Sequence, residues 1–392
     1  MLSINRKEWT AVVGFMSVGL VIGYLGPVLN IAAEELQFDA DRIGLLMSAY
    51  FGASMPAMAM GLIPWIQIGR SIALTIGAIM ILIACVLGWM STSFPLLISS
   101  TLTMGFGLGL YQIGVNTYAL DGVAEMPEKK QAGRLTYLQF YFGIGAILSP
   151  LLVSLAVDVL DNWRLIYPML ALGGVLPLTI INAMKLTPAK APAGSEHSGK
   201  KLSLKLSAAI WFMLVAGAVY ATLEGLTFTW LPYFWDQSYS SPFVTGSFTV
   251  SLFWVFFSIS RILAQLIIDH FPPKTTILSG GALIGATLAT WVLVGNSQWA
   301  SIVCIVLLAT VYACMFPTIF LVFKQMLPGD ASEVTALYFV FMTVVVSITS
   351  YSIGHLVDWF GIRSIPVILL IMTFIYLAFF KLSISRHRKV TG

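Results

Sequence analysis

The sequence predicts an all-α membrane protein with twelve transmembrane helices, arranged as two six-helix pseudo-symmetric bundles. Three observations support this fold class. Of the 392 residues, 58% are hydrophobic and only 10% are charged, whereas soluble proteins carry about 25% charged residues. Apolar stretches of about 20 residues, the length of a membrane-spanning helix, recur along the whole chain. One polar stretch near the middle separates six of these stretches from the other six.

Hydropathy and turn residues give approximate limits for the twelve helices. A β-barrel is disfavoured, because its strands would be alternating segments of about ten residues. The first apolar stretch is longer than the roughly 7–15 residues of a signal-peptide core, so we expect an uncleaved first helix. The predicted helices comprise residues 9–31, 42–62, 71–91, 96–120, 135–156, 164–184, 207–233, 244–267, 275–294, 299–322, 334–355 and 364–382.

The polar stretch "KLTPAKAPAGSEHSGKKLSLK", residues 185–205, divides the chain. Its Lys, Pro, Gly and Ser residues are typical of a flexible linker. The predicted domains are therefore an N-terminal bundle of residues 1–184, a cytoplasmic linker of residues 185–205 and a C-terminal bundle of residues 206–392. "VDVLDNWRLIYP" (157–168) and "VDWFGIRSIP" (357–366) occupy matching positions in the two halves, as parallel internal repeats would.

The lysines and arginines predict the orientation. With twelve helices, both termini lie on the same side of the membrane. All lysines and arginines except Arg42, Arg164 and Arg363 then fall on that side. Since positive residues concentrate in cytoplasmic segments, we expect both termini in the cytoplasm. The predicted location is the inner (plasma) membrane of a bacterial cell, as a multi-pass protein.

One carboxylate lies well inside a predicted helix. It is Glu224, within "YATLEGLTFTWLPYF" (220–234), and the other acidic residues fall in loops or near helix ends. Placing a charge inside the membrane costs at least about 2.5 kcal/mol, so such a residue indicates a function. Glu224 either carries protons or accepts hydrogen bonds from a polar solute. The simpler alternative is a protonated side chain that bonds a neighbouring helix. No Lys or Arg is expected inside the membrane as its partner.

Polar and aromatic residues in other helices extend this site. Tyr220, Glu224 and Thr227 share one helical face. Glycine stripes, such as Gly19 and Gly23, indicate close helix packing. Buried amides either bond across helices or bind a hydroxylated solute. Aromatic rings either line a cavity of sugar size or pack within the bundle and face lipid. The predicted substrate-binding residues are Asn30, Gln112, Asn116, Gln139, Tyr141, Tyr220, Thr227, Trp230, Trp254 and Tyr312.

Several chemistries lack support in the sequence. No P-loop motif is present, so ATP is not the evident energy source. No HExxH or GxSxG motif occurs, and the four histidines are scattered. Cys85, Cys304 and Cys314 lie in apolar stretches without a CxxC pair. We therefore expect no enzyme, no cofactor and no metal. The expected partners are a small polar solute, protons and the lipid bilayer, not nucleic acid, and the expected state is a monomer.

The layout of six plus six helices around a basic central loop resembles the major facilitator superfamily. The signature of that family, G-x-x-x-D-R-x-G-R-R, lies between helices 2 and 3. Here "LIPWIQIGRS" (62–71) supplies Gly69 and Arg70, with Ile66 at the acidic position. The second copy, "SRILAQLIIDHFPPK" (260–274), supplies Arg261 and Asp269. The resemblance implies an inner gate formed by these four matching residues, with less charge in the N-terminal half.

Three segments resemble the fucose/galactose/hexose-type proton symporters. "LQFYFGIGAILSPLL" (138–152) resembles their FFGxGAxLSPLL pattern, and "GVNTYALD" (114–121) resembles their Asn-bearing helix. Their YVGxExxxxxWL segment is matched at Tyr220, Glu224, Trp230 and Leu231. The GP-x-x-GG ending of drug-antiporter helix 5 is absent.

The resemblance implies a secondary active transporter that works by alternating access around a mid-membrane site. We expect it to move a small polar solute, such as a sugar, with Glu224 coupling transport to protons. Two alternatives stay open, namely a drug or metabolite efflux antiporter of the same fold and an uncoupled uniporter.

Overall fold

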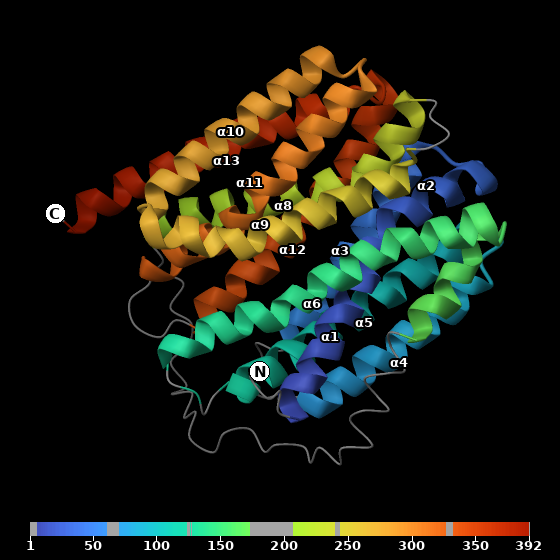
Figure 1. Ribbon diagram of the computed structural model, residues 1–392, viewed down its shortest axis with the longest axis horizontal. Coiled ribbons are helices and arrows are strands. Elements are labelled where there is room, and N and C mark those ends of the chain that lie inside the picture. The colour runs from blue at the N-terminus through green and yellow to red at the C-terminus, as the bar shows by residue number, and fades with distance from the viewer. Residues whose placement is uncertain are drawn as a thin grey trace. The chain divides into compact units, whose positions relative to one another are not determined.

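The computed structural model describes residues 6–60, 70–123, 126, 128–172, 207–239, 244–326 and 332–391, and these form helices and short connections without a strand (Figure 1). Eleven helical stretches among them are long and apolar enough to cross a membrane. The chain is thus an all-helical, multi-pass membrane protein, as predicted. Most of the predicted helix 164–184 and the whole 185–205 linker lie outside the described residues.

The chain divides into two compact units. Unit 1 comprises Met1–Phe38 and Ala49–Ser198, and unit 2 comprises Asp39–Ser48 and Gly199–Gly392. The first turns of α3 are therefore grouped with the C-terminal half of the sequence, whereas the rest of that helix belongs to unit 1.

Unit 1 contains the helices of the N-terminal half. They are α1 (Arg6–Gly23), α2 (Leu25–Leu36), α3 (Ala40–Met60, from Ala49 onward), α4 (Arg70–Trp89), α5 (Phe94–Val123), α6 (Glu128–Ser154), η1 (Leu155–Val159) and η2 (Trp163–Leu165). The predicted first helix is interrupted at Tyr24. Pro27 explains the break, because it has no N–H to donate to the carbonyl of Gly23. Together α1 and α2 still form one candidate span, Lys7–Leu36.

The glycine stripes bring helices of unit 1 into close contact. α1 packs against α5 and α6, and α4 packs against α5 (Figure 1). Gly19 faces the backbone carbonyl of Phe142 in α6, and Gly105 of α5 faces that of Tyr50 in α3. A Cβ atom at either glycine would collide with backbone, which cannot move aside as a flexible side chain can. The predicted role of these glycines in helix packing is confirmed.

Unit 2 is built around one long central helix. Its elements are α8 (Ala208–Ser238), α9 (Gly246–His270), α10 (Pro273–Val294), α11 (Gln298–Gln325), α12 (Ser332–Phe360) and α13 (Ser364–Thr391), with residues 39–48. α8 packs against α9, α11, α12 and α13. Ser207 caps its N-terminus, since the Ser207 side chain accepts a hydrogen bond from the Ile210 N–H group.

Within unit 2, α12 caps the start of α3. The Asp358 carboxylate accepts hydrogen bonds from the backbone N–H groups of Ala40, at 3.2 Å, and Asp41, at 2.9 Å. The first N–H groups of a helix have no partner inside the helix, and its N-terminus attracts negative charge. Asp358 therefore supplies the cap from another helix. Ser347 adds a second contact, because its hydroxyl donates to the Ser48 carbonyl at 2.8 Å.

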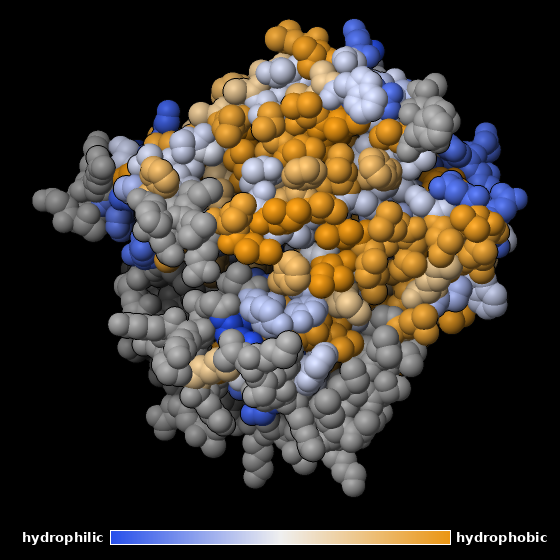
Figure 2. Space-filling view, in the orientation of Figure 1, coloured by the Kyte–Doolittle hydropathy of each residue, from blue (hydrophilic) through white to orange (hydrophobic). Residues whose placement is uncertain are grey.

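The exposed surface is strongly hydrophobic. Large apolar side chains are exposed on several helices, among them Val86, Leu293 and Phe374. On the face drawn in Figure 2, hydrophobic residues predominate among residues of intermediate hydropathy, and strongly hydrophilic residues lie mainly at the margins. A soluble monomer rarely exposes apolar patches larger than a few hundred Å². This surface is suited to lipid.

Candidate functional site

The candidate site is centred on the middle of α8. Tyr220, Glu224 and Thr227 lie on one face of this helix, as their spacing predicts. Tyr220 and Thr227 are buried, whereas Glu224 is partly exposed. The Glu224 side chain therefore lies between two buried polar residues of the same helix face.

Tyr220 is positioned to serve both protonation states of Glu224. Its hydroxyl donates to Glu224 Oε2 at 2.9 Å and lies 3.2 Å from the backbone oxygen of Tyr312. A phenol has one proton to donate. When Glu224 is ionised, that proton is directed to the carboxylate. When Glu224 is protonated, its own O–H can donate to Tyr220 Oη, and the Tyr220 proton is directed to the Tyr312 carbonyl. Glu224 thus has a hydrogen-bonding partner in either state.

A second hydroxyl pair joins α8 to α11. Thr227 Oγ1 donates to the Leu223 carbonyl at 2.8 Å and lies 3.1 Å from Tyr312 Oη. Because the threonine proton is used on Leu223, Tyr312 is the donor between the two hydroxyls. The Tyr220 ring packs edge-on against the rings of Tyr312 and Tyr376, with centroids 6.1 Å and 5.5 Å away. The predicted residues Tyr220, Glu224, Thr227 and Tyr312 therefore form one connected cluster.

Aromatic side chains of α9 border this cluster. The Trp254 ring lies 4.8 Å from that of Phe228 on α8, and Phe253 lies 6.3 Å from Tyr312, centroid to centroid. Trp254 therefore packs against Phe228, beside the cluster on α8. Trp230 is fully buried, its ring contacts Tyr233, and its Nε1–H group has no acceptor within the described parts of the chain.

Arg261 is an electrostatic partner of Glu224 that the sequence reasoning missed. No Lys or Arg was expected inside the membrane near Glu224, and that expectation is wrong. Arg261 lies in α9 within the candidate span Gly246–Leu263 and interacts electrostatically with Glu224. Its guanidinium carbon is 4.8 Å from the centroid of the Phe257 ring. The sequence contained one signal for this position. Phe253, Phe257 and Arg261 follow one another at four-residue intervals, which places all three on one helical face.

The predicted solute-binding residues of unit 1 do not form a hydrogen-bonded cluster like that of unit 2 among the described residues. Asn30 is buried in α2. Asn116 is exposed, and its side-chain amide donates to the Gln112 carbonyl of its own helix at 2.9 Å. Gln139 is also exposed. The Tyr141 hydroxyl pairs with that of Tyr137 at 3.1 Å. Among the residues described in unit 1, no hydrogen bond connects the Gln112, Asn116 and Gln139 side chains.

Three of the four predicted inner-gate residues cannot be placed. Gly69 lies outside the described residues, as do the side chains of Arg70 and Asp269. Arg261 is the described member of this set.

A buried ion pair joins α1 to α6 in unit 1. Arg134 Nε lies 2.7 Å from Glu8 Oε1, and its Nη2 lies 3.1 Å from Oε2. The Glu8 side chain is fully buried and that of Arg134 is 7% exposed. The Glu8 carboxylate raises the pKa of Arg134 further above its ordinary value, mainly through this hydrogen bond. No pattern in the sequence indicated this pair, whose members are 126 positions apart.

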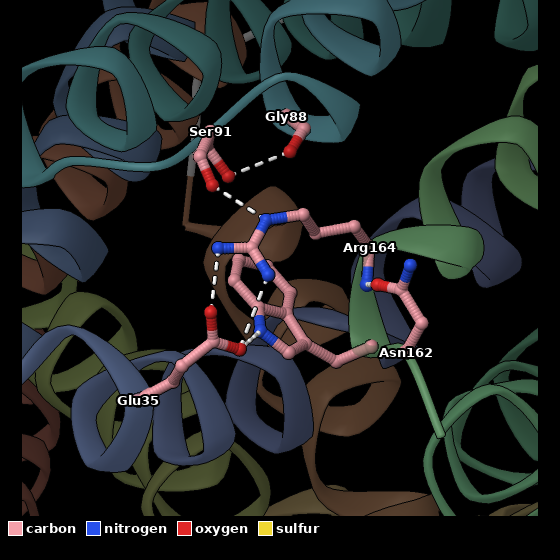
Figure 3. Close-up of polar contacts among 6 residues, drawn as sticks. Glu35, Gly88, Ser91, Asn162 and Arg164 are labelled. Carbon is pink, nitrogen blue, oxygen red and sulfur yellow. Dashed lines mark hydrogen bonds and ion pairs between the residues drawn. The ribbon is translucent and has the colours of Figure 1, made fainter. Parts of the chain in front are cut away.

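A polar cluster ties together α2, the end of α4 and η2 (Figure 3). Arg164 Nε donates to the Ser91 carbonyl at 2.6 Å, and its other two nitrogens contact Glu35 at 2.7 Å and 3.1 Å. The Trp163 indole N–H also donates to Glu35, and the guanidinium stacks on the Trp163 ring. Asn162 accepts from the Arg164 backbone N–H at 3.0 Å. These contacts fix the end of the bundle and do not form an open site.

Metal-ligating side chains do not gather in the parts of the chain that the structure describes. No group of three His, Cys, Asp or Glu residues there could hold an ion. Cys85, Cys304 and Cys314 are buried and free.

The family model of the Major Facilitator Superfamily matches residues 11–350. The chain belongs to this superfamily. A search of curated proteins gives no match. As a major facilitator the chain is a secondary transporter of small solutes across a membrane and not an enzyme.

Solved structures of other transporters share the fold at low identity. A mutant of the nucleoside transporter NupG has a TM-score of 0.73 and 16% identity, covering 97% of this chain and 100% of its own. The peptide transporter POT in complex with sulfate has a TM-score of 0.73 and 16% identity, covering 95% and 94%. A D-xylose–proton symporter has a TM-score of 0.71 and 15% identity, covering 93% and 97%. These likenesses establish the major facilitator fold.

Proposed function

We propose that this chain moves a small polar solute by alternating access and couples that movement to protons through Glu224. The observation that carries the proposal is the contact between Glu224 and Tyr220 in the middle of α8. A carboxyl group in the middle of a membrane helix is expensive unless it has a function. The Tyr220 hydroxyl can donate to ionised Glu224, or accept from protonated Glu224 while it donates to the Tyr312 carbonyl. The carboxyl group therefore has a hydrogen-bonding partner in both states.

We further propose a set of solute contacts. In unit 2, the proposed contacts are Glu224, the hydroxyl groups of Tyr220, Thr227 and Tyr312 that are linked to it, and the Trp254 ring beside Phe228. Hydroxyl groups beside aromatic rings suit a polar solute with an apolar face. The proposed contacts outside this cluster are Asn30, Gln112, Asn116, Gln139, Tyr141 and Trp230. The proposed inner gate comprises Gly69, Arg70, Arg261 and Asp269.

We also propose that the protein lies in the inner membrane with both termini in the cytoplasm, and that it acts as a monomer.

The test is solute-driven proton movement in proteoliposomes that contain a pH-sensitive dye. The panel comprises sugars, including D-xylose, together with nucleosides and dipeptides, the solute classes named for the structurally similar transporters. Wild-type protein is compared with Glu224→Gln, which keeps the shape of the side chain and cannot ionise. Glu34→Gln is the matched control, because Glu34 is exposed near the end of α2.

Under the proposal, adding a transported solute outside the vesicles acidifies the lumen with wild-type protein and with the Glu34→Gln control. Glu224→Gln is expected to lose proton movement and uphill accumulation while it still exchanges solute. Lumenal alkalinisation in wild type would instead identify an antiporter. Solute flux without any proton movement, equal in wild type and Glu224→Gln, would identify a uniporter and refute the coupling role.

A further inference from the structure

The guanidinium group of Arg261 is a second charge inside unit 2. Arg261 lies near the end of the candidate span Gly246–Leu263 of α9, and ionisable residues within such spans are rare and often functional. Arg261 takes part in neither of the ion pairs found between described side chains, Glu8–Arg134 and Glu35–Arg164. Its described contact is the face of the Phe257 ring.

The helical face that carries Arg261 points toward Glu224. Phe253 and Phe257 precede Arg261 at four-residue intervals on that face. Phe253 packs against Phe228 of α8, at 6.0 Å, and Tyr312 of α11, at 6.3 Å between centroids. Arg261 interacts electrostatically with both Glu224 and Tyr220. The two opposite charges therefore share one environment without direct contact, and no described carboxylate occupies the guanidinium donors.

We propose that Arg261 binds the carboxylate of the transported solute, and that the substrate is a small hydroxylated monocarboxylic acid. The inference rests on the proposed function, because it takes Glu224 as the site of protonation. A guanidinium presents two parallel N–H donors that match a carboxylate. The Glu224 carboxyl and the Tyr220 and Tyr312 hydroxyls are suited to the hydroxyl groups of the same solute. This role for Arg261 differs from the inner-gate role that its motif implies.

Charge balance determines the number of protons. In the empty site, ionised Glu224 and Arg261 sum to zero. A bound monocarboxylate adds one negative charge, which one proton on a Glu224 oxygen cancels. The other titratable groups that interact with Glu224 from the described helices are Tyr220, Tyr312 and Tyr338, all neutral phenols. The loaded site is then neutral, so one proton accompanies one anion and no net charge crosses. With one proton on Glu224, a site loaded with a neutral sugar would carry one positive charge. A site loaded with a dianion would carry one negative charge.

The experiment compares each acid with its uncharged parent. D-gluconate and D-galacturonate are tested beside D-glucose and D-galactose in proteoliposomes with an imposed pH gradient. A potassium diffusion potential set with valinomycin is varied independently of that gradient. We expect the acids to be taken up with protons at a rate that the pH gradient changes at least tenfold and the membrane potential changes less than twofold. The parent sugars are expected to give no proton movement.

Arg261 variants separate solute recognition from folding. Arg261→Gln is expected to abolish acid uptake. Arg261→Lys keeps the positive charge but lacks the two parallel N–H donors, so we expect it to weaken acid affinity at least tenfold. Arg363→Gln is the control, since Arg363 is exposed. Thermal stabilisation of the purified protein by gluconate or galacturonate gives a readout independent of transport. We expect stabilisation in wild type, in Glu224→Gln and in Arg363→Gln, but not in Arg261→Gln.

The outcomes for the two proposals differ. Proton-coupled, potential-driven uptake of an uncharged sugar that survives in Arg261→Gln would overturn this inference and leave the proposed function standing. Binding of an acid through Arg261 without any proton movement would refute proton coupling through Glu224 and retain Arg261 as the anion-binding residue. If neither acid stabilises wild type, or if Arg261→Lys and wild type are stabilised equally, the inference is wrong.

Discussion

The Tyr220 hydroxyl lies 2.9 Å from Glu224 Oε2 and 3.2 Å from the carbonyl oxygen of Tyr312. It therefore connects the ionisable group of α8 to the backbone of α11. Because a hydroxyl group rotates, its proton can follow the protonation state of Glu224 without movement of heavy atoms. Gain or loss of the proton is thereby accommodated within one unit, by groups that are already in place.

Tyr220→Phe is expected to impair proton coupling more than solute binding. The variant removes the hydroxyl that stabilises ionised Glu224, and a hydrogen bond to a charged group contributes about 1.5–3 kcal/mol. Since about 1.4 kcal/mol is a tenfold change, we expect proton release to slow at least tenfold while solute exchange continues. Uphill uptake and exchange are measured side by side in proteoliposomes. Tyr376→Phe is the control, because its hydroxyl donates to the Ile277 carbonyl and contacts the same cluster only through its ring. Equal effects of the two variants would contradict a specific role for Tyr220.

Asn116→Ala tests whether the amide in α5 meets solute. Its side chain is exposed and bonds only its own helix backbone at Gln112 in the described contacts, so truncation should leave folding intact. We expect solute affinity to fall about tenfold, as for a lost hydrogen bond to a polar ligand. Thr117→Ala is the matched control, because Thr117 makes the same kind of backbone bond to Ile113 at 2.7 Å. Normal binding by Asn116→Ala would assign this residue to packing.

The sequence was sufficient for features that depend on one helix at a time. Hydropathy located the helices, and the helical period placed Tyr220, Glu224 and Thr227 on one face. Helix ends were less accurate, since α8 continues to Ser238 and α13 to Thr391, beyond the apolar stretches. A helix continues as long as its backbone hydrogen bonds continue, whether or not its residues are apolar.

The remaining features depend on how helices pack. Tyr312 contacts Thr227 across 85 positions, and Arg261 approaches Glu224 from another helix. Hydropathy contains no information about such pairs. The motif comparison predicts a gate role for Arg261 but not its interaction with Glu224, because a motif match follows the order of residues and not the direction of side chains.

Glu8→Gln is expected to destabilise unit 1 strongly. The variant would remove the carboxylate that pairs with the buried Arg134 guanidinium, and removing one member of a buried ion pair costs about 3–5 kcal/mol. The apparent melting temperature in detergent is the measurement, with Glu34→Gln as an exposed control. The double variant Glu8→Gln with Arg134→Met removes both charges and should recover much of the loss. If the double variant were less stable than Glu8→Gln, loss of the Glu8–Arg134 pair would not be the cause.

Arg164→Lys is expected to have a smaller effect than Glu8→Gln. A lysine has one ammonium group and cannot contact Ser91 and both Glu35 oxygens at once, as the guanidinium does (Figure 3). The Glu35 side chain is 48% exposed, however, so solvent and salt screen its charge, and such pairs contribute about 0–1 kcal/mol. We expect a loss of about 1 kcal/mol that shrinks further in high salt, whereas the Glu8→Gln loss should not depend on salt. Melting temperatures of the two variants at low and high salt check this order. A loss from Arg164→Lys as large as that from Glu8→Gln, and independent of salt, would show that the cluster at η2 behaves as a buried ion pair.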